Sequence, residues 1–163
     1  MIRDAVPRDF PDVVKLNLES ERFVSPMNLA RLEQLNAWAA YHRVMETDGG
    51  VAAFLLGFRE GAAYDSPNYR WFAQRYERFF YIDRVIVSEA QRGRGFAAAL
   101  YEDAFAFARE HGVDTVTCEF DVDPPNPVSR KFHARFGFRE VGMNSYNNKH
   151  VAMQALRLDA RAG

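Results

Sequence analysis

Apolar and polar residues follow one another in patterns that predict strands and helices along the whole chain. Residues 2–6 predict an opening strand, and the turn at Pro7-Arg8-Asp9 leads into a first helix. Asn28 can cap a second helix, because the apolar residues after it recur at spacings of three and share one face. Those residues are Leu29, Leu32, Leu35 and Trp38.

The middle of the chain predicts strands that are separated by one irregular segment. Residues 41–46 and 51–59 are strand-like runs joined by Thr47-Asp48-Gly49-Gly50, which is typical of a hairpin turn. Residues 62–78 interrupt the pattern with aromatic and charged side chains, and a packed surface helix is the simplest structure for them. Residues 79–87 predict the next strand.

The C-terminal half predicts a strand–helix–strand unit followed by a hairpin. The helix after residues 91–95 ends at His111-Gly112, and the crossover makes the β-branched strand 115–122 parallel to strand 79–87. A short helix then runs to Gly137, and residues 138–158 predict a hairpin around Asn147-Asn148. This order indicates an α/β fold, with one domain over residues 1–163 and a mixed sheet.

Composition restricts the class of protein and its partners. The 163 residues suit one domain, and 48% hydrophobic with 26% charged residues is typical of a soluble globular protein. A net charge of −1 provides no general attraction to nucleic acid or to an anionic membrane. No apolar run approaches the roughly 18 residues of a membrane span, and MIRDAVPRDF lacks a signal-peptide core. The single cysteine, Cys118, fits a reducing cytoplasm and a packing role in its apolar strand.

The segment QRGRGFA carries the first pattern with chemical meaning. Arg92, Gly95 and Ala97 match R-x-x-G-x-A, with Gly93 and Arg94 between them, after a strand and before a helix. Glycines let the backbone turn and approach a ligand, and the N-terminus of a helix favours a phosphate group. The arginines add forked positive charge. The segment therefore predicts a pyrophosphate site, with an ordinary turn between strand and helix as the structural alternative.

Two other nucleotide-binding patterns resemble this segment in part. A P-loop requires GxxxxGK[ST], which is missing here. The dinucleotide pattern G-x-G-x-x-A does match at Gly93, Gly95 and Ala98, with Glu119 or Asp121 at a plausible distance for a ribose-binding acid. A nucleotide-binding oxidoreductase nevertheless requires further β-α units, and too little of the chain remains for them.

A second pattern, N-P-x-S-x-x-F-H-x-x-F-G-F, begins at Asn126 and includes Ser129 and His133. By itself it describes a helix with proline in its first turn and a glycine cap. Together with RGRGFA about thirty residues earlier, it resembles the GCN5-related N-acetyltransferase (GNAT) superfamily over nearly the whole chain. The resemblance implies a mixed, mostly antiparallel sheet flanked by helices, in which a splayed parallel pair of strands forms the acyl-CoA cleft.

The resemblance also implies acetyl-CoA as cosubstrate and no metal. It places the pyrophosphate on residues 92–97, the pantetheine arm on the backbone of residues 85–87, and the cofactor beside the helix after Asn126. The residues assigned to the cofactor are Val85, Ile86, Val87, Arg92, Gly93, Arg94, Gly95, Phe96, Ala97, Asn126, Ser129 and His133. His133 stands where the family often has a tyrosine that protonates the leaving thiolate, so it is a candidate acid as well as a cofactor contact.

Transfer of an acyl group to an amine also requires a group that accepts the amine's proton. Side chains alternate along a strand, so Glu119 and Asp121 share one face while Cys118 and Phe120 share the other. Glu119 and Asp121 are the candidate bases, with Asp83 as a third and solvated or ion-paired acids as the structural alternative. The aromatic segment 62–78 is a candidate cover for the acceptor site.

These observations predict an acetyl-CoA-dependent N-acetyltransferase. The acceptor would be a primary amine of a small molecule, an amino acid or a protein N-terminus, attacking directly in a ternary complex. A non-catalytic acyl-CoA-binding or sensing domain is the alternative, because the expected tyrosine is replaced. The same reasoning predicts a cytoplasmic protein, possible homodimerisation, and neither nucleic acid nor membrane as partner.

Overall fold

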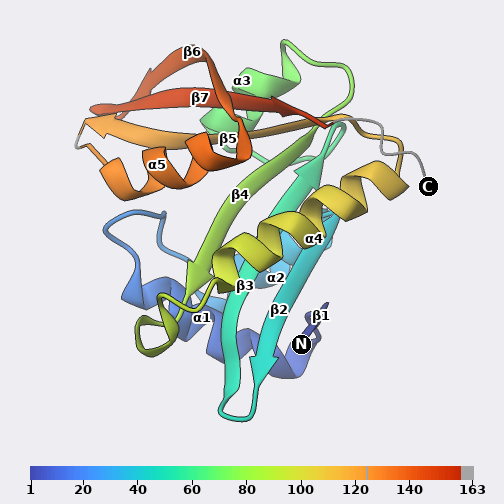
Figure 1. The fold of residues 1–163 in the computed structure, drawn as a ribbon, viewed down its shortest axis with the longest axis vertical. Helices are drawn as coiled ribbons and strands as arrows, with labels where there is room; N and C mark the ends of the chain where they lie inside the picture. Colours follow the sequence, from blue (N-terminus) through green and yellow to red (C-terminus); the bar gives the residue numbers. More distant parts are fainter. Residues whose placement is uncertain (124, 159–163) are drawn as a thin grey trace. The chain divides into compact units, whose positions relative to one another are not determined.

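The computed structural model describes residues 1–123 and 125–158 of the chain (Figure 1). In these residues the elements are, in chain order, β1 (Ile2–Asp4), η1 (Pro7–Asp9), α1 (Phe10–Glu19), α2 (Leu29–Trp38), β2 (Tyr41–Thr47), β3 (Gly50–Arg59), α3 (Pro67–Ala73), β4 (Phe80–Val87), η2 (Glu89–Gln91), α4 (Phe96–Glu110), β5 (Thr115–Asp123), α5 (Pro127–Phe136), β6 (Arg139–Tyr146) and β7 (Lys149–Arg157). The predicted order of strands and helices is confirmed, and the irregular segment 62–78 contains a short helix.

The seven strands of the described residues belong to one sheet, in the order β1-β2-β3-β4-β5-β7-β6. β4 and β5 pair in parallel, at Phe80 with Val116 and at Tyr81 with Thr117. The pairs β1–β2, β2–β3, β5–β7 and β6–β7 are antiparallel. The predicted α/β fold with a mixed, mostly antiparallel sheet and one parallel pair is therefore confirmed.

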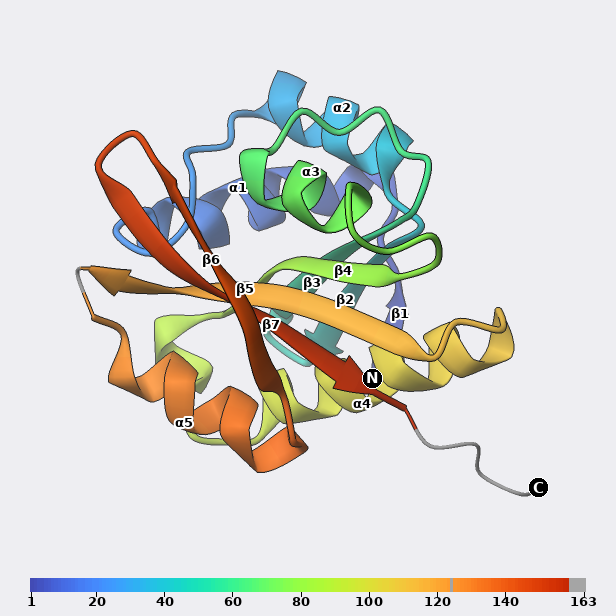
Figure 2. The same cartoon turned by 90° about the horizontal axis from the view of Figure 1, so that it is seen from above.

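The chain forms two compact units, and unit 1 consists of Met1–Phe58 and Ile82–Ala106. Within it, α1 and α2 cover one face of the strands and α4 covers the other (Figures 1 and 2). Asp103 of α4 accepts hydrogen bonds from Tyr41 and Arg43, both at 2.7 Å, while His42 between them faces the ring of Phe10 at 5.7 Å. Because helices cover both faces, β3 is a continuous buried run instead of an alternating one.

Unit 2 consists of Arg59–Tyr81 and the residues from Phe107 onward. In it, α3 and α5 lie on opposite faces of β5 (Figure 2). Glu119 points to α3, where it accepts a hydrogen bond from Asn68 at 3.0 Å, and its neighbour Phe120 packs against His133 of α5 at 6.0 Å. Because side chains alternate along β5, its neighbouring residues contact two different helices.

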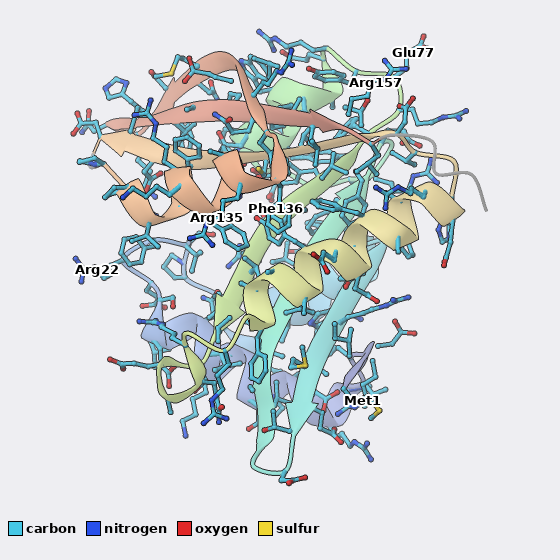
Figure 3. The ribbon with its side chains drawn as sticks, viewed as in Figure 1. Met1, Arg22, Glu77, Arg135, Phe136 and Arg157 are labelled. Carbon is cyan, nitrogen blue, oxygen red and sulfur yellow. The ribbon has the colours of Figure 1, made fainter. Side chains whose placement is uncertain are left out.

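Three backbone positions explain how the C-terminal elements of unit 2 follow one another. α5 ends at Gly137, whose φ of 93° is the left-handed conformation that closes many helices. Asn147 and Asn148 also adopt positive φ, 47° and 62°, which produces the tight hairpin turn expected there. Arg157, which is labelled in Figure 3 at the end of β7, forms an ion pair with Asp114 at 3.2 Å.

None of the helices in residues 1–123 and 125–158 is long and apolar enough to cross a membrane.

Candidate functional site

The segment between β4 and α4 has the backbone geometry that the sequence predicts for an anion site. Gly93 and Gly95 adopt φ of 83° and 79°, a region where side chains are strained. A Cβ atom added at either glycine would meet no atom within 4 Å, so both glycines border open space. α4 begins at Phe96 directly after this turn. The first N–H groups of an α-helix have no acceptor within the helix, and they are therefore available to an anion here.

The side chains of this segment add positive charge. Arg92 and Arg94 are exposed, whereas Phe96 and Ala97 in the first helical turn are half-buried. No acidic residue lies in the first turn of α4, so nothing in that turn competes with a bound anion. The segment from Arg92 to Ala97 combines backbone donors, a helix N-terminus and two guanidinium groups. This combination suits a phosphate or pyrophosphate.

The adjoining part of β4 carries the residues predicted to meet the pantetheine arm. Ile86 is buried, whereas Val85 and Val87 are half-buried. The strand is anchored by Arg84, which is 5% exposed and donates to Asn17 of α1 at 2.9 Å. Its Nε also donates to Asp83 at 2.6 Å. Asp83 is thus held in a buried ion pair, which makes it the weakest of the three candidate bases.

The carboxylate of Glu119 is held by side chains from two other elements of unit 2. The hydroxyl of Tyr81 donates to both of its oxygens, at 2.8 Å and 2.9 Å. Nδ2 of Asn68 donates to its Oε1 at 3.0 Å. The side chain is half-buried, while Tyr81 and Asn68 are almost completely buried. Two neutral donors therefore hold one carboxylate in a defined position, as proton transfer requires of a base.

Asp121 lies two residues further along β5, on the same face by strand alternation. Burial raises the pKa of its carboxyl, and the nearby Lys149 lowers it in part. A raised pKa brings a carboxylate closer to the range in which it accepts protons near neutral pH. Asp121 therefore remains the second candidate base.

His133 lies on the other face of β5, among the rings of Phe120, Phe132 and Phe138. Its Nδ1 lies 2.7 Å from the backbone oxygen of Ser129, so Nδ1 carries the ring proton in the neutral form. Burial lowers the pKa of His133, and the hydrogen bond to Ser129 raises it in part. Only the imidazolium could therefore donate a proton through Nε2, and it forms below the usual pH range of histidine.

Asn126 and Ser129 have a clear local role in α5. Oδ1 of Asn126 accepts a hydrogen bond from the backbone N–H of Ser129 at 3.2 Å, which makes Asn126 the N-cap of the helix. Arg135 and Phe136 extend from the last turn of the same helix (Figure 3). The predicted cofactor contacts of Asn126 and Ser129 therefore stay predictions, beside a capping role that the structure provides.

Cys118 is a packing residue of β5 and not a candidate nucleophile. Cys118 is 2% exposed, and burial raises the pKa of its thiol well above the usual value. A buried neutral thiol is a packing residue and a poor nucleophile. In the part of the chain that the structure describes, no three His, Cys, Asp or Glu side chains are grouped to hold a metal ion.

The predicted residues thus fall into separate groups. Residues 85–87 and 92–97 belong to unit 1, and the groups on β5 and α5 belong to unit 2. Glu119 contacts α3, alternation along β5 puts Asp121 on the same face, and His133 packs on the opposite face against Phe120. Sequence reasoning missed the partners of Glu119, which are Tyr81, Asn68 and, through Asn68, Tyr146 and Asn144. They come from three distant segments, and no local pattern connects them.

Comparison with known proteins gives a match to a family model. The model described as the acetyltransferase (GNAT) family matches residues 9–138. This range includes every predicted site residue, from Val85 on β4 to His133 on α5. Among curated protein sequences, none matches the chain.

Solved structures resemble this fold over almost its full length. Naa20 of Chaetomium thermophilum, in complex with a bisubstrate analogue, has a TM-score of 0.77 at 19% identity. The matched region covers 97% of this chain and 86% of the Naa20 chain. The ribosomal-protein-S18-alanine N-acetyltransferase of Escherichia coli has a TM-score of 0.73 at 14% identity, covering 99% and 96%. The putative acetyltransferase yncA of Salmonella typhimurium, with its cofactor acetyl-CoA, has a TM-score of 0.71 at 17% identity, covering 100% and 96%. At these identities the likeness establishes the fold.

Proposed function

The chain belongs to the acetyltransferase (GNAT) family and is an N-acetyltransferase of that family, and from this premise we propose that it transfers the acetyl group of acetyl-CoA to a primary amine. The acceptor is an amine of a small molecule, an amino acid or a protein N-terminus. We favour the N-terminus of a peptide for the first test, because a structurally similar protein is named as a ribosomal-protein-S18-alanine N-acetyltransferase.

In this proposal the donor is held by unit 1. Acetyl-CoA is the typical cosubstrate of the family, and the positive-φ glycines, the start of α4 and the two exposed arginines at residues 92–97 support a seat for its pyrophosphate. Backbone groups of residues 85–87 take the pantetheine arm. One of their N–H groups stabilises the oxyanion that forms when the thioester is attacked.

The observation that carries the proposed chemistry is the carboxylate of Glu119, held by Tyr81 and Asn68. The neutral amine attacks the thioester carbon and forms the new C–N bond, the C–S bond breaks, and the thiolate of CoA leaves. The proton released from the amine nitrogen passes to Glu119, directly or through a water molecule. Asp121 is the second candidate for this step, and its raised pKa supports it.

His133 is the candidate donor of a proton to the leaving thiolate, but its environment restricts when it can act. Because Nδ1–H is committed to the oxygen of Ser129 and burial lowers the pKa of the ring, the donating imidazolium is present only in acid. At neutral pH we propose that His133 contributes by holding α5 against β5 and that the thiolate leaves without its proton.

The test is an acetyl-transfer assay with a set of acceptors. The protein is incubated with acetyl-CoA and with peptides that have free N-termini, free amino acids and small diamines, and the released CoA thiol and the acetylated product are measured. We expect one acceptor class to be acetylated. In that reaction Glu119→Gln should lower kcat by about a hundredfold or more, the usual contribution of a general base. The matched control is Glu140→Gln, which changes an exposed carboxylate on β6.

Two outcomes would contradict this proposal. Unchanged turnover in both Glu119→Gln and Asp121→Asn would show that neither carboxylate accepts the proton. Tight binding of acetyl-CoA without turnover of any amine would contradict the acceptor assignment. The homodimer, the cytoplasmic location and the single domain over residues 1–163 stay predictions; sedimentation and limited proteolysis would test the first and the last.

A further inference from the structure

The short helix α3 contains one buried polar side chain, that of Asn68. The helix starts at a defined point, because the hydroxyl of Ser66 accepts a hydrogen bond from the backbone N–H of Tyr69 and Pro67 occupies the first turn. Asn68 therefore lies in the first turn of α3. Its side chain is 4% exposed, so its amide group has to be satisfied inside the protein.

The amide of Asn68 is hydrogen-bonded through both of its polar atoms. Nδ2 donates to Oε1 of Glu119 at 3.0 Å and to the hydroxyl of Tyr146 at 2.9 Å. Oδ1 accepts a hydrogen bond from Nδ2 of Asn144 at 3.1 Å. A reversed amide would place its oxygen against a carboxylate and its NH₂ against another NH₂, so these partners determine its orientation.

α3 is placed against β6 by a second, apolar contact. The indole of Trp71 lies directly over Gly142, so that a Cβ atom at this glycine would lie 2.7 Å from Cη2 and closer still to Cζ2. Trp71 and Asn68 therefore both face the strands from one helix. The close approach depends on the missing side chain of Gly142.

The carboxylate of Glu119 thus accepts hydrogen bonds from Tyr81 of β4 and from Asn68 of α3. Tyr81 is fixed in the sheet, where it pairs with Thr117 of β5. Asn68 belongs to the segment between β3 and β4. Hydrogen bonds to an ionised carboxylate stabilise the charged form, and their direction sets where the remaining oxygen lone pairs point.

We propose that Asn68 is a positioning residue, through which α3 orients the carboxylate of Glu119 and keeps it ionised for proton acceptance. The inference rests on the proposed function of Glu119 as the base. It assigns a role to the segment 62–78, whose sequence shows only an aromatic and charged interruption. It also connects Asn144 and Tyr146 of β6 to the same base.

Two variants of Asn68 separate orientation from packing. Asn68→Leu removes both N–H donors at similar volume, and Asn68→Asp replaces the NH₂ group by an oxygen that repels the carboxylate of Glu119. Using the acceptor with the highest turnover in the panel, we expect Asn68→Leu to lower kcat/KM by about tenfold to a hundredfold. The Kd for acetyl-CoA should stay unchanged. The acidic limb of the pH profile should move to higher pH in Asn68→Leu and further in Asn68→Asp.

The matched control is Trp71→Leu, which loosens the same helix against β6 without touching the hydrogen bonds of Glu119. We expect it to lower the thermal stability and to leave the pH profile of kcat/KM unchanged. A shift in Trp71→Leu as large as that in Asn68→Leu would overturn the proposal, because the effect would then come from helix packing. An unaltered profile in both Asn68 variants, with native circular dichroism, would also overturn it.

A measurement without turnover distinguishes this inference from the proposed function. The carboxyl carbon of Glu119 is titrated by carbon NMR in the wild-type protein and in Asn68→Leu, with Glu119→Gln to assign the resonance. We expect the midpoint of the titration to rise in Asn68→Leu. An unchanged midpoint refutes the role of Asn68 even if Glu119 is the base, whereas full activity of Glu119→Gln refutes the base even if the midpoint moves.

Discussion

Acid should destabilise this protein through a buried histidine in unit 1, and the structure allows the size of the effect to be worked out. His42 of β2 is 8% exposed, between the rings of Phe10 at 5.7 Å and Phe54 at 6.2 Å. Its Nδ1 lies 2.8 Å from Oδ1 of Asn36 and is therefore the donor. Among the described residues, Nε2 is buried and has no hydrogen-bond partner. A second proton on this ring would have nothing to bind it.

This environment favours the neutral ring. Burial lowers the pKa of His42 to about 4, and the carboxylates of Asp9 and Asp4 raise it only in part. The unfolded chain takes up the proton near the ordinary pKa of about 6.5. Between these values the unfolded state binds more protons, so stability is full above about pH 6.5 and falls as the pH drops toward 4.

The loss follows from the two pKa values. At about 1.4 kcal/mol per pKa unit, His42 should reduce the free energy of unfolding by about 1.4 kcal/mol at pH 5.5 and by about 2.5 kcal/mol at pH 4.5, relative to pH 7.5. The change is large, because total stabilities are about 5–15 kcal/mol. Kinetic pH profiles of this protein should therefore be interpreted above the pH where unfolding begins.

The assay is urea unfolding, followed by tryptophan fluorescence, at pH 7.5, 6.5, 5.5 and 4.5. His42→Gln removes the titrating ring and keeps a donor for Asn36. Between pH 7.5 and 5.5 its free energy of unfolding should therefore fall by about 1.4 kcal/mol less than that of the wild type. His150→Gln, which replaces an exposed ring on the β6–β7 hairpin, should follow the wild-type curve. If His42→Gln and the wild type lose the same free energy over this range, the reasoning about His42 is refuted.

Three further predictions concern the site. Replacing Arg92 and Arg94 together by alanine should weaken acetyl-CoA binding by about tenfold or more for each lost charge-assisted bond, as measured by calorimetry. An unchanged affinity would contradict the pyrophosphate site at residues 92–97. His133→Phe should leave kcat nearly unchanged above pH 6.5 and reduce it only in acid, because burial lowers the pKa of the ring; a large loss at pH 8 in a folded variant would contradict this. Gly142→Ala should lower the free energy of unfolding in urea by about 1–3 kcal/mol, because its Cβ meets the indole of Trp71. In a Trp71→Leu background most of this loss should disappear, and equal losses in both backgrounds would disprove the contact.

The family motifs could be recognised without a structure because each acts locally. Two glycines next to the start of a helix predict an anion site from neighbouring residues alone. The pattern from Asn126 to Gly137 contains both ends of α5, its N-cap and its left-handed C-cap. Caps and tight turns depend on neighbouring residues, so they can be predicted from the chain alone.

The same holds for the arrangement of side chains along β5. Alternation in a strand requires no knowledge of its neighbours, and Glu119 and Phe120 do point to different helices. Which helix receives which face could not be predicted, since it depends on how α3 and α5 pack. His133 could be named as a candidate acid from its position in the pattern. Its tautomer and the direction of its pKa shift could not be predicted, because they depend on the oxygen of Ser129 and on the surrounding rings.

The sequence by itself determined the order of elements, the parallel β4–β5 pair, the family and the candidate residues, because periodicity, turns and short motifs are properties of neighbouring positions. Tertiary structure alone decided that Glu119 is held by Tyr81 and Asn68, that Asp83 is paired with Arg84, and that α3 rests on Gly142. Apart from the adjacent pair Asp83 and Arg84, these contacts join residues about forty to seventy positions apart. Such contacts depend on the packing of the folded chain, which no local pattern of the sequence records.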